Sequence, residues 1–178
     1  MAITYIPLPQ PEELTSREKE DAMGAYLMMF AAFAISIPLP IVNLIAAIIY
    51  FYINRKKSRY IHFHCLQSLL SQLPTTLINW GMLYWALQIF LFDNLEVNDY
   101  FYAYLGFMIL ANLIYFIFSI VAAIRARKGV FMYFIFFGSF AYNQVYSSEN
   151  NLFYDNEEKP EKKAQQLNKP PFEWSKRL

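Results

Sequence analysis

Two histidines and a cysteine lie close together near the start of an uncharged stretch, and these side chains are typical ligands of transition metals. They are His62, His64 and Cys65, and the chain contains no other histidine or cysteine. Residues two apart on a helix point about 200° away from each other, so His62 and His64 are poorly placed to share one ion. The sequence therefore predicts neither a metal site nor a cofactor, and it leaves His64 as a polar group within a helical bundle.

The same stretch carries polar side chains at helical spacing. On a helix with 3.6 residues per turn they fall within half a turn, opposite a row of leucines. Because polar groups are costly in hydrocarbon, we expect this stripe to face other helices, water or a partner. Three interpretations stay open: hydrogen bonds between helices, a solvated groove or substrate path, and a docking face for another protein. The stripe consists of His64, Gln67, Ser68, Ser71, Gln72, Thr75, Thr76 and Asn79.

Motifs of enzymes are missing from the chain. It contains no HExxH, GxSxG, glycine-rich phosphate loop or CxxC, and no carboxylate lies inside its long apolar runs to relay protons. The formal net charge of +1 creates no field that would attract nucleic acid. The sequence therefore predicts a protein that is not an enzyme and has no nucleic-acid partner.

Four runs without Asp, Glu, Lys or Arg indicate a membrane protein. They are 22–54, 60–92, 100–124 and 129–148, and charged residues make up only 16% of the chain, against roughly 25% in a typical globular domain. A helix needs about 20 apolar residues to cross about 30 Å of hydrocarbon. The predicted fold class is therefore all-α, a polytopic membrane protein with the lipid bilayer as a partner.

Composition divides the chain into three segments. Prolines at the start indicate an extended arm, and the mixture of charges and prolines at the end is typical of a solvated tail. The predicted segments are an N-terminal arm over 1–15, a membrane domain over 16–146 and a polar cytoplasmic tail over 147–178.

Within the membrane domain we predict a four-helix bundle whose first hairpin is broken by proline. Thr15-Ser16-Arg17-Glu18 matches a capping box, so a helix should begin near Ser16. Pro38-Leu39-Pro40 should end that helix and turn the chain back, although a single kinked crossing is the competing interpretation. The predicted helices cover 16–37, 41–54, 58–92 and 100–124.

The stretch 130–146 is apolar but rich in aromatic residues, and Gly138 interrupts it. Aromatic rings favour the boundary between membrane and water, and they are frequent among interface hot spots. We therefore predict an interfacial or re-entrant segment in place of a fifth span. Its aromatic residues, together with one in the tail, should contact lipid headgroups or a partner protein: Phe131, Phe134, Phe136, Phe137 and Trp174.

Charges in the short loops predict the orientation. The loop 93–99 is acidic and contains no basic residue, whereas basic clusters flank the other ends of the third and fourth predicted helices. The positive-inside rule places these clusters in the cytoplasm and 93–99 outside. In a bacterial inner membrane both termini would then be cytoplasmic. The orienting residues are Arg55, Lys56, Lys57, Arg59, Arg125, Arg127 and Lys128.

The segment Phe63-His64-Cys65-Leu66-Gln67-Ser68 resembles an element, aromatic–His/Asn–x–x–Gln, of a four-helix membrane family. This is the family of the chloroplast inner-envelope import translocon's twenty-kilodalton Tic subunit and its bacterial relatives. The order of apolar runs and charged clusters over 18–146 is also similar. The resemblance implies a four-helix membrane fold and association with protein translocation, with no known catalytic residue.

The expected function is then that of a non-enzymatic subunit in a complex for protein export, insertion or translocation. Its partners would be other membrane subunits, such as those of a Sec-type translocon or a secretion system. The alternative is an independent small-solute channel or carrier, for which the polar stripe would form the path.

Overall fold

The computed structural model describes residues 5–31, 40–92, 96–147 and 167–171, and within these ranges the fold is all-helical, as predicted. By length and composition, α5 alone among the described helices could cross a membrane, so the bundle of four spans stays a prediction. In chain order the elements are the 3-10 helix η1 (Pro11–Glu13), α1 (Ser16–Leu27), the 3-10 helix η2 (Met28–Phe30), α3 (Pro40–Asn54), α4 (Arg59–Phe90), α5 (Asp99–Arg127) and α6 (Phe137–Tyr146).

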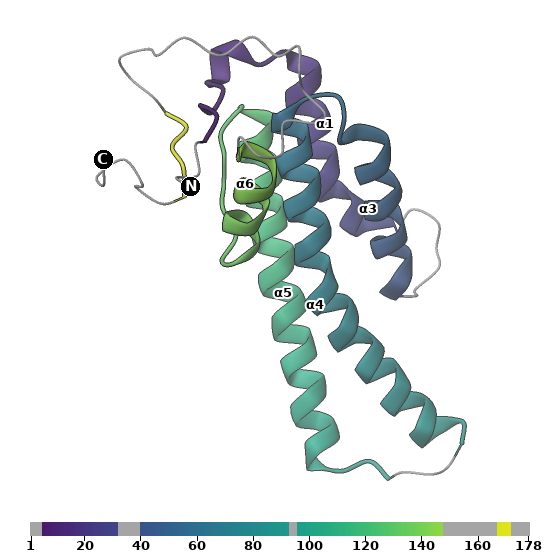
Figure 1. Ribbon diagram of the computed structural model, residues 1–178. Helices are drawn as coiled ribbons and strands as arrows, with labels where there is room; N and C mark the ends of the chain where they lie inside the picture. The colour runs from purple at the N-terminus through teal and green to yellow at the C-terminus, as the bar shows by residue number, and fades with distance from the viewer. Residues whose placement is uncertain (1–4, 32–39, 93–95, 148–166, 172–178) are drawn as a thin grey trace.

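Helices α4 and α5 form a long antiparallel pair that carries the other elements at one end (Figure 1). Helix α1 packs against both of them, α3 packs on α4, and α6 lies beside the N-terminal part of α4. The opposite ends of the pair, around Phe90 and Asp99, project away from these contacts. One end of the molecule is therefore a multilayered body and the other is a two-helix stem.

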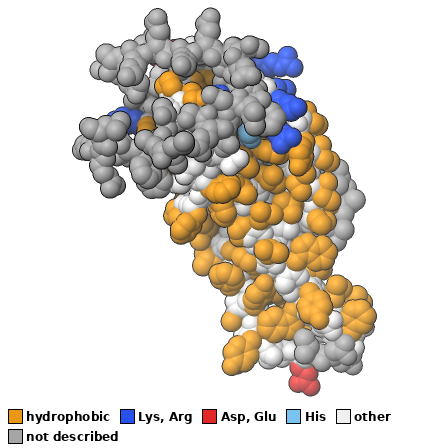
Figure 2. Space-filling model, viewed as in Figure 1, with side chains coloured by type: hydrophobic (Ala, Val, Ile, Leu, Met, Phe, Trp, Pro, Cys, Tyr) orange, Lys and Arg blue, Asp and Glu red, His pale blue; other side chains and the backbone are white. Residues whose placement is uncertain are grey.

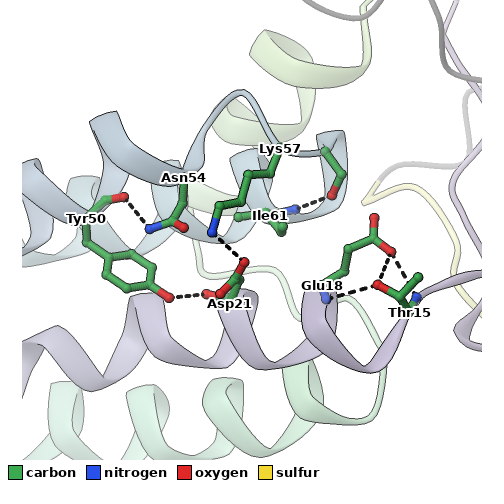
Figure 3. A network of polar contacts seen from close by, with 8 residues as sticks. Thr15, Glu18, Asp21, Tyr50, Asn54, Lys57 and Ile61 are labelled. Atoms are coloured by element: carbon green, nitrogen blue, oxygen red, sulfur yellow. Dashed lines mark hydrogen bonds and ion pairs between the residues drawn. The ribbon is translucent and has the colours of Figure 1, made fainter.

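Polar contacts hold α1 and α3 side by side in opposite directions (Figure 3). The predicted capping box forms: the Thr15 hydroxyl accepts a hydrogen bond from the Glu18 backbone at 3.2 Å, and the Glu18 carboxylate accepts one from the Thr15 backbone at 2.9 Å. Farther along, Tyr50 donates to the backbone carbonyl of Asp21 and Lys57 to its carboxylate, each at 2.8 Å. The end of α3 and the residues just after it are thereby fixed beside the middle of α1.

The predicted first helix, 16–37, is helical over its described part, from Ser16 to Ala31. Helix α1 ends at Leu27 and tightens into η2, a short 3-10 turn within the helical stretch, and Ala31 is helical again. The rest of the prediction lies outside the described residues. Two residues of the predicted turn, Pro38 and Leu39, lie outside the described residues. Helix α3 begins at the third, Pro40.

The C-terminal end of α5 reverses the chain. Gly129 has a φ of +77°, and its N–H donates to the Ala126 carbonyl at 3.0 Å, while the Val130 N–H donates to the Arg125 carbonyl at 3.0 Å. These two bonds form a Schellman motif, for which glycine is favoured because a side chain disfavours positive φ. The segment after Gly129 consequently runs back along the helices and ends in α6 (Figure 1).

A docked piece of the tail covers the reversal. Asn168 is 2% exposed, and its side-chain amide donates to the carbonyls of Pro9 and Gly129 at 2.8 and 2.9 Å. Its side-chain oxygen accepts from the Phe131 backbone at 3.0 Å. Asn168 thus departs from the solvated tail expected from composition, because its amide satisfies backbone groups from two distant segments, whereas Leu167, Lys169 and Pro170 are exposed.

Candidate functional site: a polar clasp and a polar cavity on α4

The polar stripe lies on the inward side of α4. His64, Gln67, Ser68, Ser71, Gln72 and Thr76 are buried, and Thr75 and Asn79 are half-buried. On the other side of the helix, Leu73 and Leu77 are exposed. The structure divides the stripe into two parts with different surroundings: a set of hydrogen bonds near the start of α4, and a cavity farther along.

Gln67 is the centre of the first part, which we call the clasp (Tyr26, His64, Gln67, Met132 and Phe134). Its side-chain nitrogen donates to the Met132 carbonyl at 2.9 Å and to the Tyr26 hydroxyl at 2.7 Å. Its side-chain oxygen accepts from the Phe134 backbone at 3.1 Å. Non-helical backbone needs such partners when it is buried, so this one amide supports the chain where it runs outside any helix.

His64 belongs to the clasp, and its ring lies among other neighbours than the ring of His62, so the two are not placed to bind one metal ion. Its Nδ1 lies 2.9 Å from the Tyr26 hydroxyl, and aromatic rings surround it, the nearest being Tyr60 with a centroid distance of 4.5 Å. The His62 ring instead packs against Phe51. Within the described ranges, no three side chains of His, Cys, Asp or Glu come together.

Two serines let α4 approach α1 closely. The Ser68 hydroxyl donates to the Ala25 carbonyl on α1 at 2.7 Å, and the Ser71 hydroxyl donates to the Ser68 carbonyl at 2.9 Å. Ala25 itself is buried at this contact. The Ser68 bond joins two helices, as such bonds do in membranes, whereas the Ser71 bond stays within α4 and satisfies its hydroxyl locally.

Farther along the stripe a cavity of about 460 Å³ lies between η2, α3, α4 and α5. On its wall, Asn79 and Asn112 form a reciprocal amide pair, with bonds of 3.1 and 2.7 Å. None of the described residues that line it is charged. The polar lining consists of Asn43, Gln72, Thr75, Thr76, Asn79, Asn112 and Tyr115, and the apolar lining of Met29, Phe30 and Phe116.

Buried polar atoms lack partners beside this cavity. Gln72 is 2% exposed, and neither its side-chain nitrogen nor its oxygen has a hydrogen-bond partner among the described residues. The same holds for the hydroxyls of Tyr115 and Ser119. The Tyr115 hydroxyl lies close to Ser71, Gln72 and Ser119, but no contact among these side chains reaches normal hydrogen-bond geometry. Such groups normally bind water or a ligand.

The predicted aromatic contacts separate into buried and exposed residues. Phe131 and Phe134 are buried in the core and Phe137 is half-buried, so the first two cannot be surface anchors. Phe136 is 83% exposed and Ile135 is 74% exposed. Phe136 is the centre of a γ-turn, with a φ of 66° and a 2.8 Å bond from the Phe137 N–H to the Ile135 carbonyl. A positive φ is costly for Phe136 because, unlike glycine, it has a bulky side chain. Trp174 lies outside the described residues.

Basic residues gather at the multilayered end of the molecule, and an acidic side chain marks the end of the stem (Figure 2). Arg59 is buried, and its guanidinium donates to the Val145 carbonyl at the end of α6 at 3.0 Å, so it also has a packing role. Lys57 pairs with Asp21, and Arg127 pairs with Glu20 at 2.8 Å. The orienting residues predicted from the sequence thus lie together, and three of them also fix neighbouring elements. The remaining members of that set are Arg55, Lys56, Arg125 and Lys128.

Tyrosines tie α6 to the N-terminal arm. The Tyr142 ring stacks on Tyr5 with a centroid distance of 5.3 Å and on Tyr146 at 5.5 Å. Burial raises the pKa of Tyr142 to about 12, and the neighbouring Tyr5 adds to the shift. Burial likewise raises the pKa of Tyr133. Both hydroxyls therefore remain neutral well above physiological pH.

Sequence reasoning missed the contribution of α5 to the cavity. Asn112 and Tyr115 line the cavity, and the buried Ser119 follows them on the same face of the helix at a spacing of three and four residues. That spacing inside an uncharged run could have identified them. No comparable pattern marks Asn168.

Comparison with protein families gives a match over residues 18–141 to MamF/MmsF, described as the magnetosome magnetite crystal formation protein family. The match covers well over half of the chain and includes most of α1, all of α3, α4 and α5, and the first half of α6. Neither the curated proteins nor the solved structures gave a match. Proteins of this family are membrane-associated.

This match corrects the functional expectations drawn from the sequence. The resemblance to the Tic translocon family is wrong, and so are the protein-translocation function, the Sec-type or secretion-system partners and the alternative of a small-solute channel or carrier. The resemblance relied on the order of apolar runs and on Phe63–Ser68, where His64 and Gln67 serve the internal clasp. Those features describe a helical layout and carry no information about translocation. The chain belongs to the MamF/MmsF family of magnetosome magnetite crystal formation proteins.

Proposed function

We propose that this protein is an integral component of the membrane around a growing magnetite crystal and acts in crystal formation without catalysing a reaction. The observation that carries the proposal is the family match over 18–141, which spans nearly all of the described helical body. In the clasp, the polar side chains of α4 bind backbone groups and other side chains. This arrangement supports a structural role for them in place of a chemical one.

The exterior of α5 supports insertion in a membrane. Only 17% of its most apolar stretch is buried in the protein, whereas the core helix of a soluble protein would be mostly covered. Hydrophobic side chains make up much of the described surface that is visible on the stem (Figure 2). Contiguous apolar patches of this extent are rare on soluble monomers, and lipid chains would cover this one.

The lengths of the helices support two complete crossings. Helix α5 has 29 residues and α4 has 32, so each exceeds the roughly 20 residues that a crossing needs. Of these two, α5 alone is also apolar enough by composition; α4 is less apolar because it carries the polar stripe, and our proposal lets it cross because most of that stripe is buried against neighbouring helices. Helix α3 has 15 residues, and the described helical stretch of α1 and η2 runs from Ser16 to Ala31, so each is shorter than the roughly 20 residues that a crossing needs. In our proposal α4 and α5 cross the membrane, and the α1–α3 hairpin enters it from the basic end.

The charge distribution supports one orientation. The basic residues around the start of α4 and the end of α5 would lie in the cytoplasm, together with both chain termini. Asn98 and Asp99, at the start of α5, would then lie on the side away from the cytoplasm. The exposed Ile135 and Phe136 would reach the lipid from the cytoplasmic side, because the γ-turn lies beside Phe134, which contacts Phe118 on α5 at a centroid distance of 6.0 Å.

The experiment is complementation in a magnetite-forming bacterium that lacks its own member of the family. Expression of this chain should restore the size of the magnetite crystals, measured by electron microscopy. Leu113→Arg should reduce both membrane recovery and rescue, because arginine at the centre of a span costs about 3 kcal/mol. Tyr100→Arg is the matched control, since it is exposed at the end of the same helix. Stable membrane insertion of the wild-type chain with no change in the crystals would contradict the proposal.

A further inference from the structure

The cavity on α4 is chemically unlike the apolar surface around it. Gln72, Thr76 and Asn79 line it from α4, and Asn112 and Tyr115 line it from α5. Their side chains are amides and hydroxyls, which are neutral and include both donors and acceptors of hydrogen bonds. The inference that follows rests on the proposed membrane placement and concerns what occupies this cavity.

The cavity lies near the middle of the proposed span. Asn112 is 13 residues from Asp99 at the start of α5 and 13 residues from Arg125 near its end. Each separation is about 20 Å at the standard helical rise. Lipid headgroups lie near the ends of a span, so their charged groups would not reach this depth. The occupant must therefore be a molecule that can stay among neutral polar groups within hydrocarbon.

The lining residues favour an occupant without a charge. No described lining residue carries a charge, and an unpaired ion is very costly in an apolar environment. Gln72 offers an unpartnered donor and an unpartnered acceptor from a side chain that is 98% buried. A hydroxyl group can satisfy both, because it donates and accepts.

We propose that this cavity binds neutral hydroxyl-bearing molecules, either water or a small polyol, at the centre of the membrane-spanning pair. Its volume of about 460 Å³ has room for on the order of ten water molecules, each of which occupies about 30 Å³ in the liquid. Gln72 and Tyr115 hold the bound hydroxyl groups, and the Asn79–Asn112 pair forms a polar wall. Ions are excluded.

Single cysteines in phosphatidylcholine vesicles test this inference. In a Cys65→Ala background, Thr76→Cys places the thiol in the cavity lining, and Leu77→Cys places it on the adjacent side chain, which is 71% exposed toward the proposed lipid. The probe is a small, neutral, water-soluble thiol reagent. Labelling of both cysteines after unfolding in detergent confirms that each thiol is present.

Thr76→Cys should react at least about tenfold faster than Leu77→Cys, because the thiolate is the reacting form and apolar surroundings suppress it. Slow reaction of both cysteines in the vesicles would overturn the cavity inference and leave the membrane placement intact. Fast reaction of both would overturn the membrane placement and the inference with it.

A second comparison identifies the source of the hydroxyl groups. If a polyol occupies the cavity, excess glycerol should slow the labelling of Thr76→Cys; if water alone occupies it, glycerol should have no effect. In the absence of glycerol, addition of Gln72→Leu should slow the labelling, because it removes the unpartnered amide that holds water in the cavity. Unchanged labelling in the Gln72→Leu variant would contradict the role of Gln72, even if Thr76→Cys remained reactive.

Discussion

The side-chain oxygen of Gln67 accepts a hydrogen bond from the backbone N–H of Phe134 at 3.1 Å, which joins the first third of α4 to a segment outside any helix. The amide nitrogen of the same side chain donates to the Met132 carbonyl and to the Tyr26 hydroxyl. A single glutamine thus connects α1, α4 and the chain that leads into α6. This connection explains how an aromatic, non-helical segment can pack inward without leaving its backbone groups unpaired.

Replacement of Gln67 by leucine should destabilise the protein strongly. The change leaves the backbone N–H of Phe134 and the carbonyl of Met132 without their partner, and each buried orphan group costs about 1–3 kcal/mol. Gln88→Leu is the control, since Gln88 is half-buried near the far end of the same helix. Thermal unfolding in mild detergent measures the difference, and equal midpoints for the two variants would count against the clasp.

Gly138→Ala should be more harmful than Gly106→Ala. A Cβ at Gly138 would lie 2.7 Å from the backbone of Tyr133 and 2.8 Å from the Gln67 side-chain oxygen, whereas one at Gly106 meets nothing within 4 Å. At exposed Gly106, alanine should stabilise α5 by about 0.5–1 kcal/mol because it restricts the unfolded chain. The same unfolding assay should give shifts of opposite sign, and a stabilised Gly138→Ala variant would show that 133–138 is not packed against Gln67.

Removal of the Asn168 side chain should release the docked tail. Asn168→Ala removes three side-chain hydrogen bonds and leaves the buried Gly129 carbonyl and Phe131 N–H without them. Limited proteolysis should then cleave the C-terminal segment faster than in the wild type. Leu167→Ala is the neighbouring control, because Leu167 is exposed, and similar cleavage rates in the two variants would contradict the docking.

Alkaline pH should loosen the contact between α6 and the N-terminal arm. Tyr142 has a pKa of about 12 in the folded protein, against an ordinary value of about 10. Its contribution to stability is therefore complete below pH 10 and is lost as the pH rises from 10 to 12, because the unfolded chain releases the proton first. Tyr142→Phe should weaken this pH dependence in unfolding experiments. An identical loss of stability in the two proteins over that range would exclude Tyr142 as its source.

Local signals in the sequence predicted much of the helical framework. Thr15 and Glu18 form the predicted capping box, and the polar stripe of α4 lies on the buried side because polar groups and leucines alternate with the helical period. These features depend on residues within a few turns of each other. The cavity was only one of three interpretations of the stripe, because its other wall comes from α5.

Contacts between distant segments could not be predicted in the same way. Asn168 joins Pro9, Gly129 and Phe131, and nothing in the composition of the tail distinguishes that asparagine from its neighbours. Phe131 and Phe134 were predicted as partner contacts because aromatic content indicates apolar surface without saying which side is buried. The function came from the family match, since the order of helices and charges is compatible with more than one membrane process.

Labelling from one side of the membrane tests the central claim most directly, namely that α4 and α5 cross the membrane with the basic end in the cytoplasm. In a Cys65→Ala background, Val97→Cys and Lys128→Cys place exposed thiols at opposite ends of α5. A membrane-impermeant maleimide added to intact spheroplasts should label Val97→Cys at once and Lys128→Cys only after the membrane is permeabilised. Immediate labelling of both positions, or of Lys128→Cys alone, would contradict the account.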